Sequence, residues 1–247
     1  MKTFFKEIFN KTVFNKNFLK ASRFLYFSKT NPQPLEFDKN EKCLLLAPHP
    51  DDETFGCGGL LTKYPDNFHV VCLTDGIHGN FDKTPDHEQI KKNRQNEFIS
   101  ALAVAGVKSY QFLEIPDRKL IKHYDTFKTL DLSKYDYIFL PNYMDNHKDH
   151  KAVTVLLQKL LRESEHKNNC KIAFYEIWGA LPIFNYYADI TFIRNQKIKM
   201  INCYMSQLKN LDFLKGIIGL NKYRGTCVNL GFTEVFSVTD IETFKKL

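Results

Sequence analysis

The chain has 247 residues, 43% of them hydrophobic and 14% aromatic, so it is long enough to bury a substantial core. Its formal net charge is +7, but residues 1–30 hold seven lysine and arginine residues against one acidic residue, Glu7. The rest of the chain is therefore nearly neutral, which excludes an extended basic surface for nucleic acid on its body. The six cysteines form no C-x-x-C pair, and we expect free thiols in a reducing compartment.

The first 41 residues are expected to form a basic, aromatic arm and a linker, and residues 42–247 a single domain. Apolar residues of the first 30 fall roughly on one side of a helix, and charged residues interrupt every apolar run. Neither a signal peptide nor a membrane span fits this pattern, so we expect a cytoplasmic protein. The arm is predicted to pack on the domain or, alternatively, to attach the protein to an anionic inner-membrane surface. Prolines and polar residues between 28 and 42 predict the linker.

From residue 43 onward, short β-rich segments alternate with longer segments of helical periodicity. This alternation predicts an α/β fold, a mostly parallel sheet with helices on both faces. In such folds the functional residues gather in the loops at the carboxyl ends of the strands. The predicted strands are 43–48, 69–76, 110–117, 135–142 and 171–179, and the predicted helices are 58–64, 86–107 and 147–164.

The first predicted strand ends in the segment H-P-D-D-E, residues 49–53. Three adjacent carboxylates beside a histidine repel one another unless a cation lies among them or they point in different directions. Two residues separate His49 from Asp52, so a tight turn stiffened by Pro50 can direct both at one ion. The alternative is that Asp51 or Asp52 simply caps the next helix.

A second cluster follows the fourth predicted strand. His147 and His150 extend the apolar stripe of the helix 147–164 towards its start, so both should face the protein. The positive end of the helix favours neutral imidazole, which is the form that binds metals. Asp145 and Asp149 lie beside them. Two histidines and an aspartate leave one position for water, as in catalytic zinc sites, and ferrous iron would also accept this set.

At this point the sequence resembles a family, the LmbE-like or PIG-L-type zinc N-deacetylases, over about residues 42–238. The segments PHPDDE and HKDH carry the resemblance, and further landmarks follow in order. The resemblance implies a Rossmann-like sheet and removal of the N-acetyl group from amino-sugar substrates. The further landmarks are LTDG (73–76), RQNE (94–97), IPD (115–117), YE (175–176), Lys197, YMSQ (204–207), RG (224–225) and TEVF (233–236).

The resemblance also implies roles for individual residues. The metal site would hold zinc, the general base would accept a proton from the attacking water, and a histidine would stabilise the developing negative charge. The residues that match are His49, Asp52 and His150 as ligands, Asp51 as the base, His147 as the stabilising histidine and Asp149 as the residue that positions it.

Four further residues are candidates for substrate binding. With the resemblance, Arg94 is expected to reach the substrate, although Arg94 and Glu97 could instead form a surface ion pair. Asp75 and Asp117 follow predicted strands, where they either hydrogen-bond sugar hydroxyls or cap helices. Trp178, the only tryptophan, is expected as an apolar wall against a sugar face.

The leading hypothesis is a metal-dependent hydrolase that removes an acetyl group from an amino sugar or glycoconjugate, such as a glycolipid, a nucleotide sugar or a surface-polysaccharide precursor. One alternative is an amidase with the same metal site acting on another N-acyl conjugate. Another is a noncatalytic sugar-binding module on the same scaffold. No nucleic-acid partner is expected, and the sequence makes no prediction of an oligomeric state.

Overall fold

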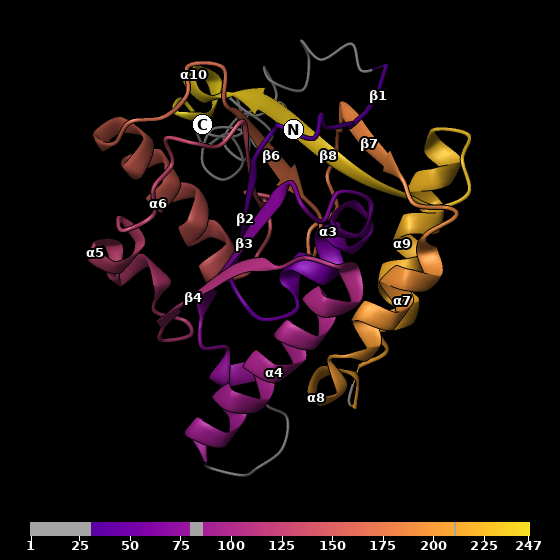
Figure 1. Cartoon of the computed structure of the whole chain (residues 1–247), viewed down its shortest axis with the longest axis horizontal. Coiled ribbons are helices and arrows are strands. Elements are labelled where there is room, and N and C mark those ends of the chain that lie inside the picture. Colours follow the sequence, from indigo (N-terminus) through magenta and orange to yellow (C-terminus); the bar gives the residue numbers. More distant parts are fainter. Residues whose placement is uncertain (1–30, 80–85, 210) are drawn as a thin grey trace, which may run out of the picture.

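The computed structural model describes residues 31–79, 86–209 and 211–247, so the arm predicted in residues 1–30 lies outside the described residues. Eight strands form one sheet in the order β1-β7-β8-β6-β5-β2-β3-β4 (Figure 1). Neighbouring strands from β4 to β6 pair in parallel, whereas β8 runs antiparallel to β6 and β7. The predicted α/β fold is therefore confirmed. The strands are β1 Gln33–Pro34, β2 Cys43–Ala47, β3 Phe68–Thr74, β4 Ser109–Ile115, β5 Tyr137–Pro141, β6 Lys171–Tyr175, β7 Tyr186–Asp189 and β8 Thr233–Asp240.

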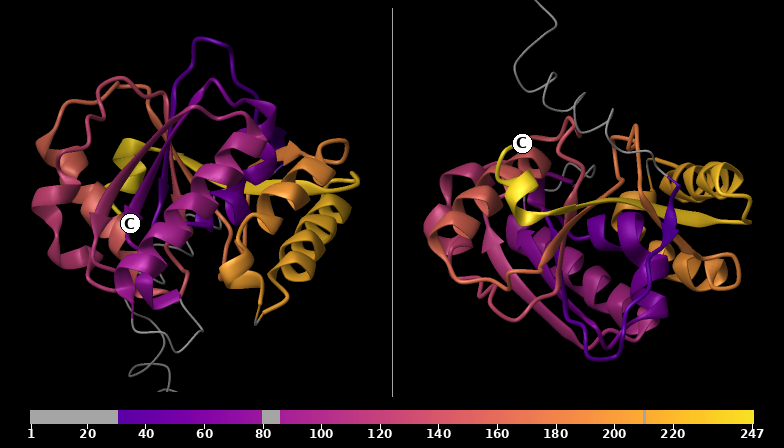
Figure 2. Two further views of the ribbon diagram at one scale, coloured as in Figure 1. Left: turned by 60° about the horizontal axis from the view of Figure 1, so that its bottom comes forward. Right: turned by 90° about the horizontal axis from the view of Figure 1, so that it is seen from above.

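Helices cover both faces of the sheet (Figures 1 and 2). Along β2, Cys43 and Leu45 pack with residues of α3 and α4, while Leu44 and Leu46 pack with residues of α6, because successive side chains of a strand point to opposite faces. The helices are α3 Asp52–Lys63, α4 His87–Ala105, α5 Tyr124–Phe127, α6 Lys148–Glu163, α7 Arg194–Asn202, α8 Met205–Leu208, α9 Phe213–Cys227 and α10 Ile241–Phe244, with 3-10 turns η1 Ile77–Gly79 and η2 Leu120–Lys122.

All five predicted strands are present, and β1, β7 and β8 are additional. Strand β8 has the sequence TEVFSVTD. Its polar residues interrupt the apolar run that would predict a buried strand. The structure nevertheless buries every residue of β8 except the last. The one carboxylate in the interior of the strand, Glu234, is satisfied by partners from α3 and α7, the backbone N–H groups of Gly59 and Leu60 and the Lys197 ammonium.

The segment predicted as a linker packs against the sheet. Residues Gln33 and Pro34 form the edge strand β1, which pairs in parallel with β7. Leu35 is buried, and the ring of Phe37 makes edge-to-face contacts with Tyr137 at 5.1 Å between ring centroids. Prolines are compatible with an edge strand, so the prolines of this segment did not prevent the regular structure that a predicted linker would lack.

The glycine-rich segment that follows H-P-D-D-E is helical. Helix α3 begins at Asp52, six residues before the predicted start, and contains Gly56 and Gly59. A Cβ atom on Gly56 would overlap the ring of Tyr175, and one on Gly59 would overlap Ile190. The glycines therefore let neighbouring elements approach the backbone of α3, and they form no phosphate-binding loop.

A buried ion pair connects α3, α7 and β8. The Nζ atom of Lys197, a fully buried residue, donates to Oε1 of Glu234 at 2.6 Å and to the carbonyl oxygen of Phe55 at 2.9 Å. The carboxylate of Glu234 also accepts the backbone N–H groups of Gly59 and Leu60 at 2.7 and 2.8 Å. Each buried polar group of the pair is thus hydrogen-bonded, which is the condition for keeping charges in the interior.

We predict that Lys197→Met destabilises the protein by about 3–5 kcal/mol, because it leaves the carboxylate of Glu234 buried without its cation. Urea unfolding monitored by circular dichroism measures the change. Lys128→Met is the matched control, since Lys128 pairs with Asp125 on the surface and its loss should leave the unfolding midpoint unchanged. Equal midpoints for both variants would contradict the prediction.

Candidate metal centre

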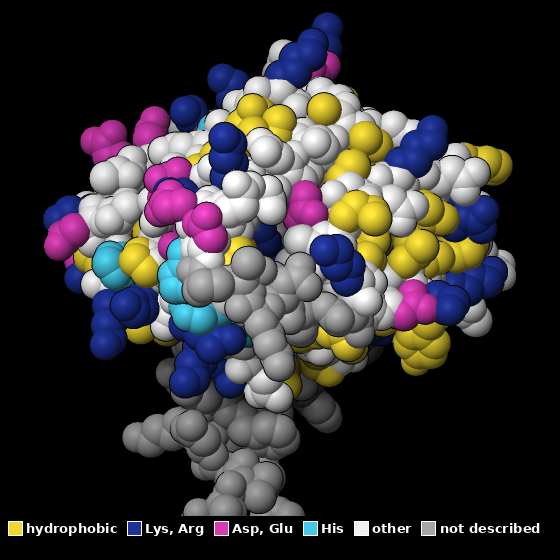
Figure 3. Space-filling model, turned by 90° about the horizontal axis from the view of Figure 1, so that it is seen from below, with side chains coloured by type: hydrophobic (Ala, Val, Ile, Leu, Met, Phe, Trp, Pro, Cys, Tyr) yellow, Lys and Arg dark blue, Asp and Glu magenta, His cyan; other side chains and the backbone are white. Residues whose placement is uncertain are grey.

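The candidate site lies where the strand order reverses. From β2 the chain proceeds to β3 and β4 on one side, and then to β5 and β6 on the other side of β2. The loops that follow β2 and β5 therefore meet at the carboxyl ends of two adjacent parallel strands, the usual ligand position in such sheets. In the space-filling view from below, histidine side chains gather beside acidic ones (Figure 3).

Two imidazoles converge on one carboxylate at this point. Oδ2 of Asp52 lies 3.1 Å from Nδ1 of His49 and 3.2 Å from Nε2 of His150. Neither ring nitrogen of His150 makes a hydrogen bond of acceptable geometry, although both are buried. Ligand atoms about 2.0–2.1 Å from a tetrahedral zinc ion lie about 3.3 Å from one another. The structure brings His49, His147 and His150 close enough to hold one metal ion, and His49, Asp117 and Asp149 form a second such group. The set of His49, Asp52 and His150 therefore stays a prediction, which the contacts of the Asp52 carboxylate with both imidazoles support.

The third histidine lies beside the other two. The ring centroid of His147 is 4.6 Å from that of His49 and 4.8 Å from that of His150. His147 is the N-cap of α6, and its Nδ1 accepts the backbone N–H of Asp149 at 3.3 Å. A neutral ring with Nδ1 as the acceptor carries its proton on Nε2. His147 can therefore donate a hydrogen bond from Nε2.

Burial and charge set the protonation of these rings. Burial lowers the pKa of His147, and the neighbouring histidines lower it further, which agrees with the neutral imidazole predicted there. Burial also lowers the pKa of His150, but Asp52 and Asp145 raise it to about 9, so the neutral, metal-binding form of this ring stays a prediction. The carboxylates win because opposite charges within about 4–6 Å favour the charged form. A bound cation would compete with this proton.

Asp51 is adjacent to the ligand cluster and belongs to none of its short contacts. Its backbone has φ 145°, a strained conformation for a residue with a side chain, and its carboxylate makes no capping bond to α3. The alternative that Asp51 caps the helix is therefore wrong. Nη2 of Arg94 instead donates to its Oδ2 at 3.0 Å and to the carbonyl oxygen of Pro50 at 2.5 Å. Burial raises the pKa of Asp51, and Arg94 opposes the shift.

The carboxylates of Asp149 and Asp117 contact His49. Nε2 of His49 lies 3.3 Å from Oδ2 of Asp149 and 3.4 Å from Oδ1 of Asp117. Asp149 also accepts the backbone N–H groups of Arg118 and Leu120. Asp149 was predicted to position His147. In the structure its carboxylate faces His49, and its backbone N–H donates to His147.

A cleft of about 160 Å³ opens over the cluster. Arg94, Asp117 and Trp178 line it together with His49, Asp51, Asp52 and His147. Asp75 is not among the lining residues, because its Oδ1 accepts the backbone N–H groups of Ile77 and Asp117 at 3.3 and 3.1 Å. Of the four predicted substrate contacts, three therefore line the cleft, and Asp75 supports one of them.

Residues 44–161 match the model of the family described as PIG-L: GlcNAc-PI de-N-acetylase, a segment that runs from β2 into α6 and contains both halves of the cluster. This part of the chain is a PIG-L (LmbE-like) domain. The family expected from the PHPDDE and HKDH segments is thereby confirmed.

One protein of similar sequence and two of similar structure show how far the similarity extends. The diacetylchitobiose deacetylase of Thermococcus kodakarensis is 33% identical over 87 residues, which cover 34% of this chain and 33% of that protein, so the chain matches about a third of its length. The N,N'-diacetylchitobiose deacetylase of Pyrococcus horikoshii superposes with a TM-score of 0.70 at 22% identity, covering 94% of this chain and 95% of that one. GalB, the 4-carboxy-2-hydroxymuconate hydratase of Pseudomonas putida KT2440, gives 0.64 at 17% identity, covering 81% and 96%. Since a hydratase shares this PIG-L fold, the reaction must be argued from the site.

Of the remaining landmarks, LTDG and YMSQ reach the cleft through Gly76 and Gln207, and the others contact neighbouring elements. Glu176 follows β6, and its carboxylate pairs with the guanidinium of Arg224 on α9, which also donates to the carbonyl oxygen of Leu181 at 2.7 Å. These landmarks hold elements from distant parts of the chain around the site. The other pairs are Lys197 with Glu234, Tyr204 with Glu53, Ser206 with Glu97, and Tyr175 with the carbonyl oxygen of Leu46.

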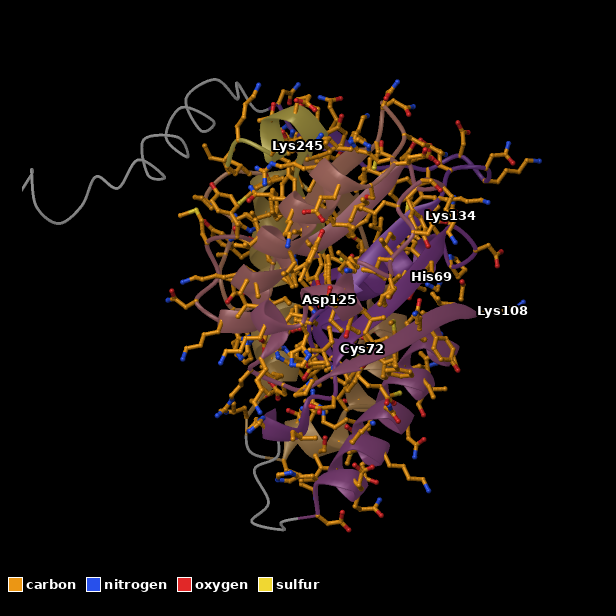
Figure 4. All side chains as sticks on the ribbon, turned by 90° about the vertical axis from the view of Figure 1, so that its left-hand side faces the viewer. His69, Cys72, Lys108, Asp125, Lys134 and Lys245 are labelled. Carbon is orange, nitrogen blue, oxygen red and sulfur yellow. The ribbon has the colours of Figure 1, made fainter. Side chains whose placement is uncertain are left out.

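His69 lies outside the cluster and has structural surroundings, whereas His78 lines the cleft beside Asp117. His69 lies near the start of β3 in the direction of Lys134, and Cys72 lies further along the same strand (Figure 4). Nδ1 of His69 is 2.7 Å from Oγ of Ser109, and the ring stacks on Tyr135 with 6.4 Å between centroids. This end of the strand is the end away from the metal cluster.

Asp145 is a site residue to which the sequence analysis gave no role. It is fully buried, and its Oδ2 lies 3.1 Å from Nδ1 of His150, on the side of the ring opposite Asp52. The same carboxylate accepts the backbone N–H groups of His147, Trp178 and Gly179 at 2.9, 3.1 and 3.3 Å. Asp145 therefore orients the His150 ring and connects it to the cleft wall. The D-x-H spacing before His147 was the available signal.

We predict that Asp145→Asn lowers the zinc affinity by about 10–100-fold, because an amide orients His150 less strongly than a carboxylate does. Competition with a chromophoric chelator measures the affinity. Asp189→Asn serves as the control, since Asp189 contacts Thr191 and lies outside the cluster. Unchanged zinc affinity in a folded Asp145→Asn protein would show that Asp145 does not orient the ligand.

No helix among the described residues is both long enough and apolar enough to cross a membrane.

Proposed function

We propose that this chain is a metal-dependent N-deacetylase that hydrolyses the acetamide of an amino sugar or glycoconjugate. The observation that carries the proposal is the placement of Asp51, a buried and strained carboxylate, beside a His-Asp-His set spaced for a metal. Catalytic zinc sites keep three protein ligands and one open position, and His49, Asp52 and His150 would be those ligands. Zinc, or ferrous iron, would supply a polarised carbonyl and an acidified water there.

Asp51 is the proposed general base. Its carboxylate lines the cleft, and Arg94 fixes its orientation through Oδ2, which leaves Oδ1 for the attacking water. Burial raises its pKa, and a base with a raised pKa accepts a proton more readily near neutral pH. Attack at the acetyl carbon forms the new C–O bond while the proton of the water passes to Asp51.

His147 is the proposed stabiliser of the oxyanion. It lines the cleft, and its Nδ1 is engaged by the backbone N–H of Asp149, so the Nε2–H is directed elsewhere. A donor fixed before the reaction stabilises negative charge that develops on the carbonyl oxygen. The C–N bond then breaks as the protonated Asp51 gives its proton to the departing amine, and acetate is released.

The sugar is proposed to lie between Asp117 and Trp178. Asp117 lines the cleft with one carboxylate edge, and the backbone N–H of His78 holds its Oδ2 at 2.9 Å. Trp178 is 56% exposed and follows β6, at the same edge of the sheet as Asp117. Carboxylates suit sugar hydroxyls, and indole faces suit the apolar faces of sugar rings. The related deacetylases act on diacetylchitobiose, which supports an N-acetylglucosamine unit here.

We predict that Asp51→Asn lowers kcat for acetate release by about 10²–10⁴-fold while zinc remains bound stoichiometrically. The measurement is acetate release from N-acetylglucosamine and diacetylchitobiose, with zinc content determined on the same samples. Asn keeps the shape of the side chain and its contact with Arg94. Full activity of the variant would favour a different base, and no activity of the zinc-loaded wild type would favour the noncatalytic sugar-binding alternative.

Removal of the metal tests the proposal in a second way. Dialysis against a chelator should abolish acetate release, because His49, Asp52 and His150 would then hold no metal ion to polarise the carbonyl group of the acetamide. Addition of one equivalent of zinc, or of ferrous iron under anaerobic conditions, should restore the activity, and the metal that restores more identifies the preferred one. The metal content of the dialysed protein should be verified to lie below about 5% of one ion per chain. Undiminished activity at that metal content would exclude metal-dependent hydrolysis.

A further inference from the structure

The peptide group between Pro50 and Asp51 is hydrogen-bonded on both sides. Nη2 of Arg94 donates to its carbonyl oxygen at 2.5 Å, and its N–H group donates to Oε2 of Glu53 at 3.2 Å. Arg94 and Glu53 are 2% and 0% exposed, so water does not compete for either contact. We call this arrangement the peptide clamp. Two side chains, one from α4 and one from α3, therefore fix the plane of the peptide group that precedes Asp51.

The peptide group that follows Asp51 is held as well. Its carbonyl oxygen accepts the backbone N–H groups of Thr54 and Phe55 at 3.1 and 2.9 Å, in the first turn of α3. Because both flanking peptide planes are fixed, the backbone of Asp51 stays at φ 145°. A residue with a side chain keeps such a conformation only where its surroundings over-determine it. The backbone thus sets the direction of the Asp51 side chain, and the contact of Arg94 with its Oδ2 completes the placement.

Glu53 is anchored by donors other than Asp51. Its carboxylate also accepts the hydroxyl of Thr54 and the hydroxyl of Tyr204, a fully buried residue that precedes α8. Such donors offset the cost of removing a carboxylate from water. Glu53 is not among the described residues that line the cleft. It can therefore influence the cleft only through the residues that it contacts, and Asp51 is the one that lines the cleft.

We propose that Glu53 is a positioning residue: together with Arg94 it holds Asp51 in the strained backbone conformation that directs the Asp51 carboxylate into the cleft. This inference rests on the proposed function of Asp51 as the base and adds the residue that places it. Asp52 is held separately, because its Oδ2 accepts the backbone N–H of His49 at 2.9 Å. Loss of the peptide clamp should therefore displace the base and leave the metal site in place.

The first experiment removes the acceptor of the Asp51 N–H. Glu53→Met, which keeps a side chain of similar length, should lower kcat for acetate release from diacetylchitobiose by about 100-fold in the zinc-loaded protein, because a displacement of about 1 Å at a reacting group has an effect of that size. KM and the zinc affinity should stay unchanged. An unchanged kcat in the folded variant, or a loss of zinc affinity that accounts for the loss of kcat, would overturn the inference.

Two further variants separate positioning from a general loss of packing. Glu53→Gln keeps a carbonyl oxygen for the Asp51 N–H, and its amide can donate to the neighbouring hydroxyls, so kcat should recover to within about tenfold of the wild-type value. Glu97→Met is the matched control, since the Glu97 carboxylate accepts the backbone N–H and the hydroxyl of Ser206 at 2.7 and 2.6 Å. These donors are of the same kinds, but they lie on α8 and not at Asp51, so kcat should stay unchanged. Equal losses of kcat in Glu53→Met and Glu97→Met would overturn the inference.

The backbone strain can be measured without turnover. Glycine adopts φ 145° freely and alanine does not, so Asp51→Gly should unfold at a higher urea concentration than Asp51→Ala in the otherwise wild-type chain. In the Glu53→Met background the alanine can relax to an ordinary φ. The order of the two midpoints should then reverse, because alanine restricts the unfolded chain more than glycine does. The same difference between the glycine and alanine variants in both backgrounds would overturn the inference.

The stability and activity measurements together separate the peptide clamp from the reaction. A difference between Asp51→Gly and Asp51→Ala that depends on Glu53, without acetate release by the zinc-loaded wild type, would support the clamp and reject the deacetylase. Acetate release that Glu53→Met leaves intact would support the deacetylase and reject the clamp.

Discussion

The crowding of negative charge at the carboxyl ends of β2 and β5 is the constraint on which this structure depends. Asp52 and Asp149 are buried within contact distance of the imidazoles, and Asp51 is buried next to Asp52 and paired with Arg94. Carboxylates brought together in a medium of low dielectric constant repel one another strongly unless cations lie among them. The imidazoles and Arg94 supply part of that charge, and a divalent metal at the His-Asp-His set would supply the rest. The carboxylates that follow β2 would thus provide the negative charge of a cation-binding site.

Maintaining this cluster requires a rigid surrounding, and buried ion pairs supply it. Lys197 with Glu234 and Arg224 with Glu176 connect the C-terminal third of the chain to α3 and β6, which carry the site. Pairs of this kind contribute little net free energy of folding compared with apolar packing, but removing one partner is costly. In this structure the ion pairs hold the elements that they connect in fixed positions. Each fixes the approach of an element whose loop borders the cleft.

The shared fold and the separate specificity occupy different parts of the molecule. Proteins with different reactions, a hydratase and deacetylases, share this sheet, so the sheet alone does not select the substrate. In this chain the cleft wall opposite the metal cluster is built from the loop after β6 and from the start of α9. These segments carry Trp178 and Phe213, and they determine which substituent can lie beside the sugar. The proposed metal site would set the chemistry, and the segments around Trp178 and Phe213 border the space beside it.

The sequence by itself determined the parallel core and the location of the candidate site. Apolar runs followed by charged residues located β2 and β5, and strand alternation placed their ends together, because parallel strands present their carboxyl ends on one edge. It could not show β8, whose carboxylate Glu234 is paired with a residue far away in the chain, nor the burial of Leu35 and Phe37. Only the tertiary structure placed Asp145 against His150, directed Arg94 to Asp51 and turned Asp75 away from the cleft. Those contacts join residues far apart in the chain, and local periodicity carries no information about such pairings.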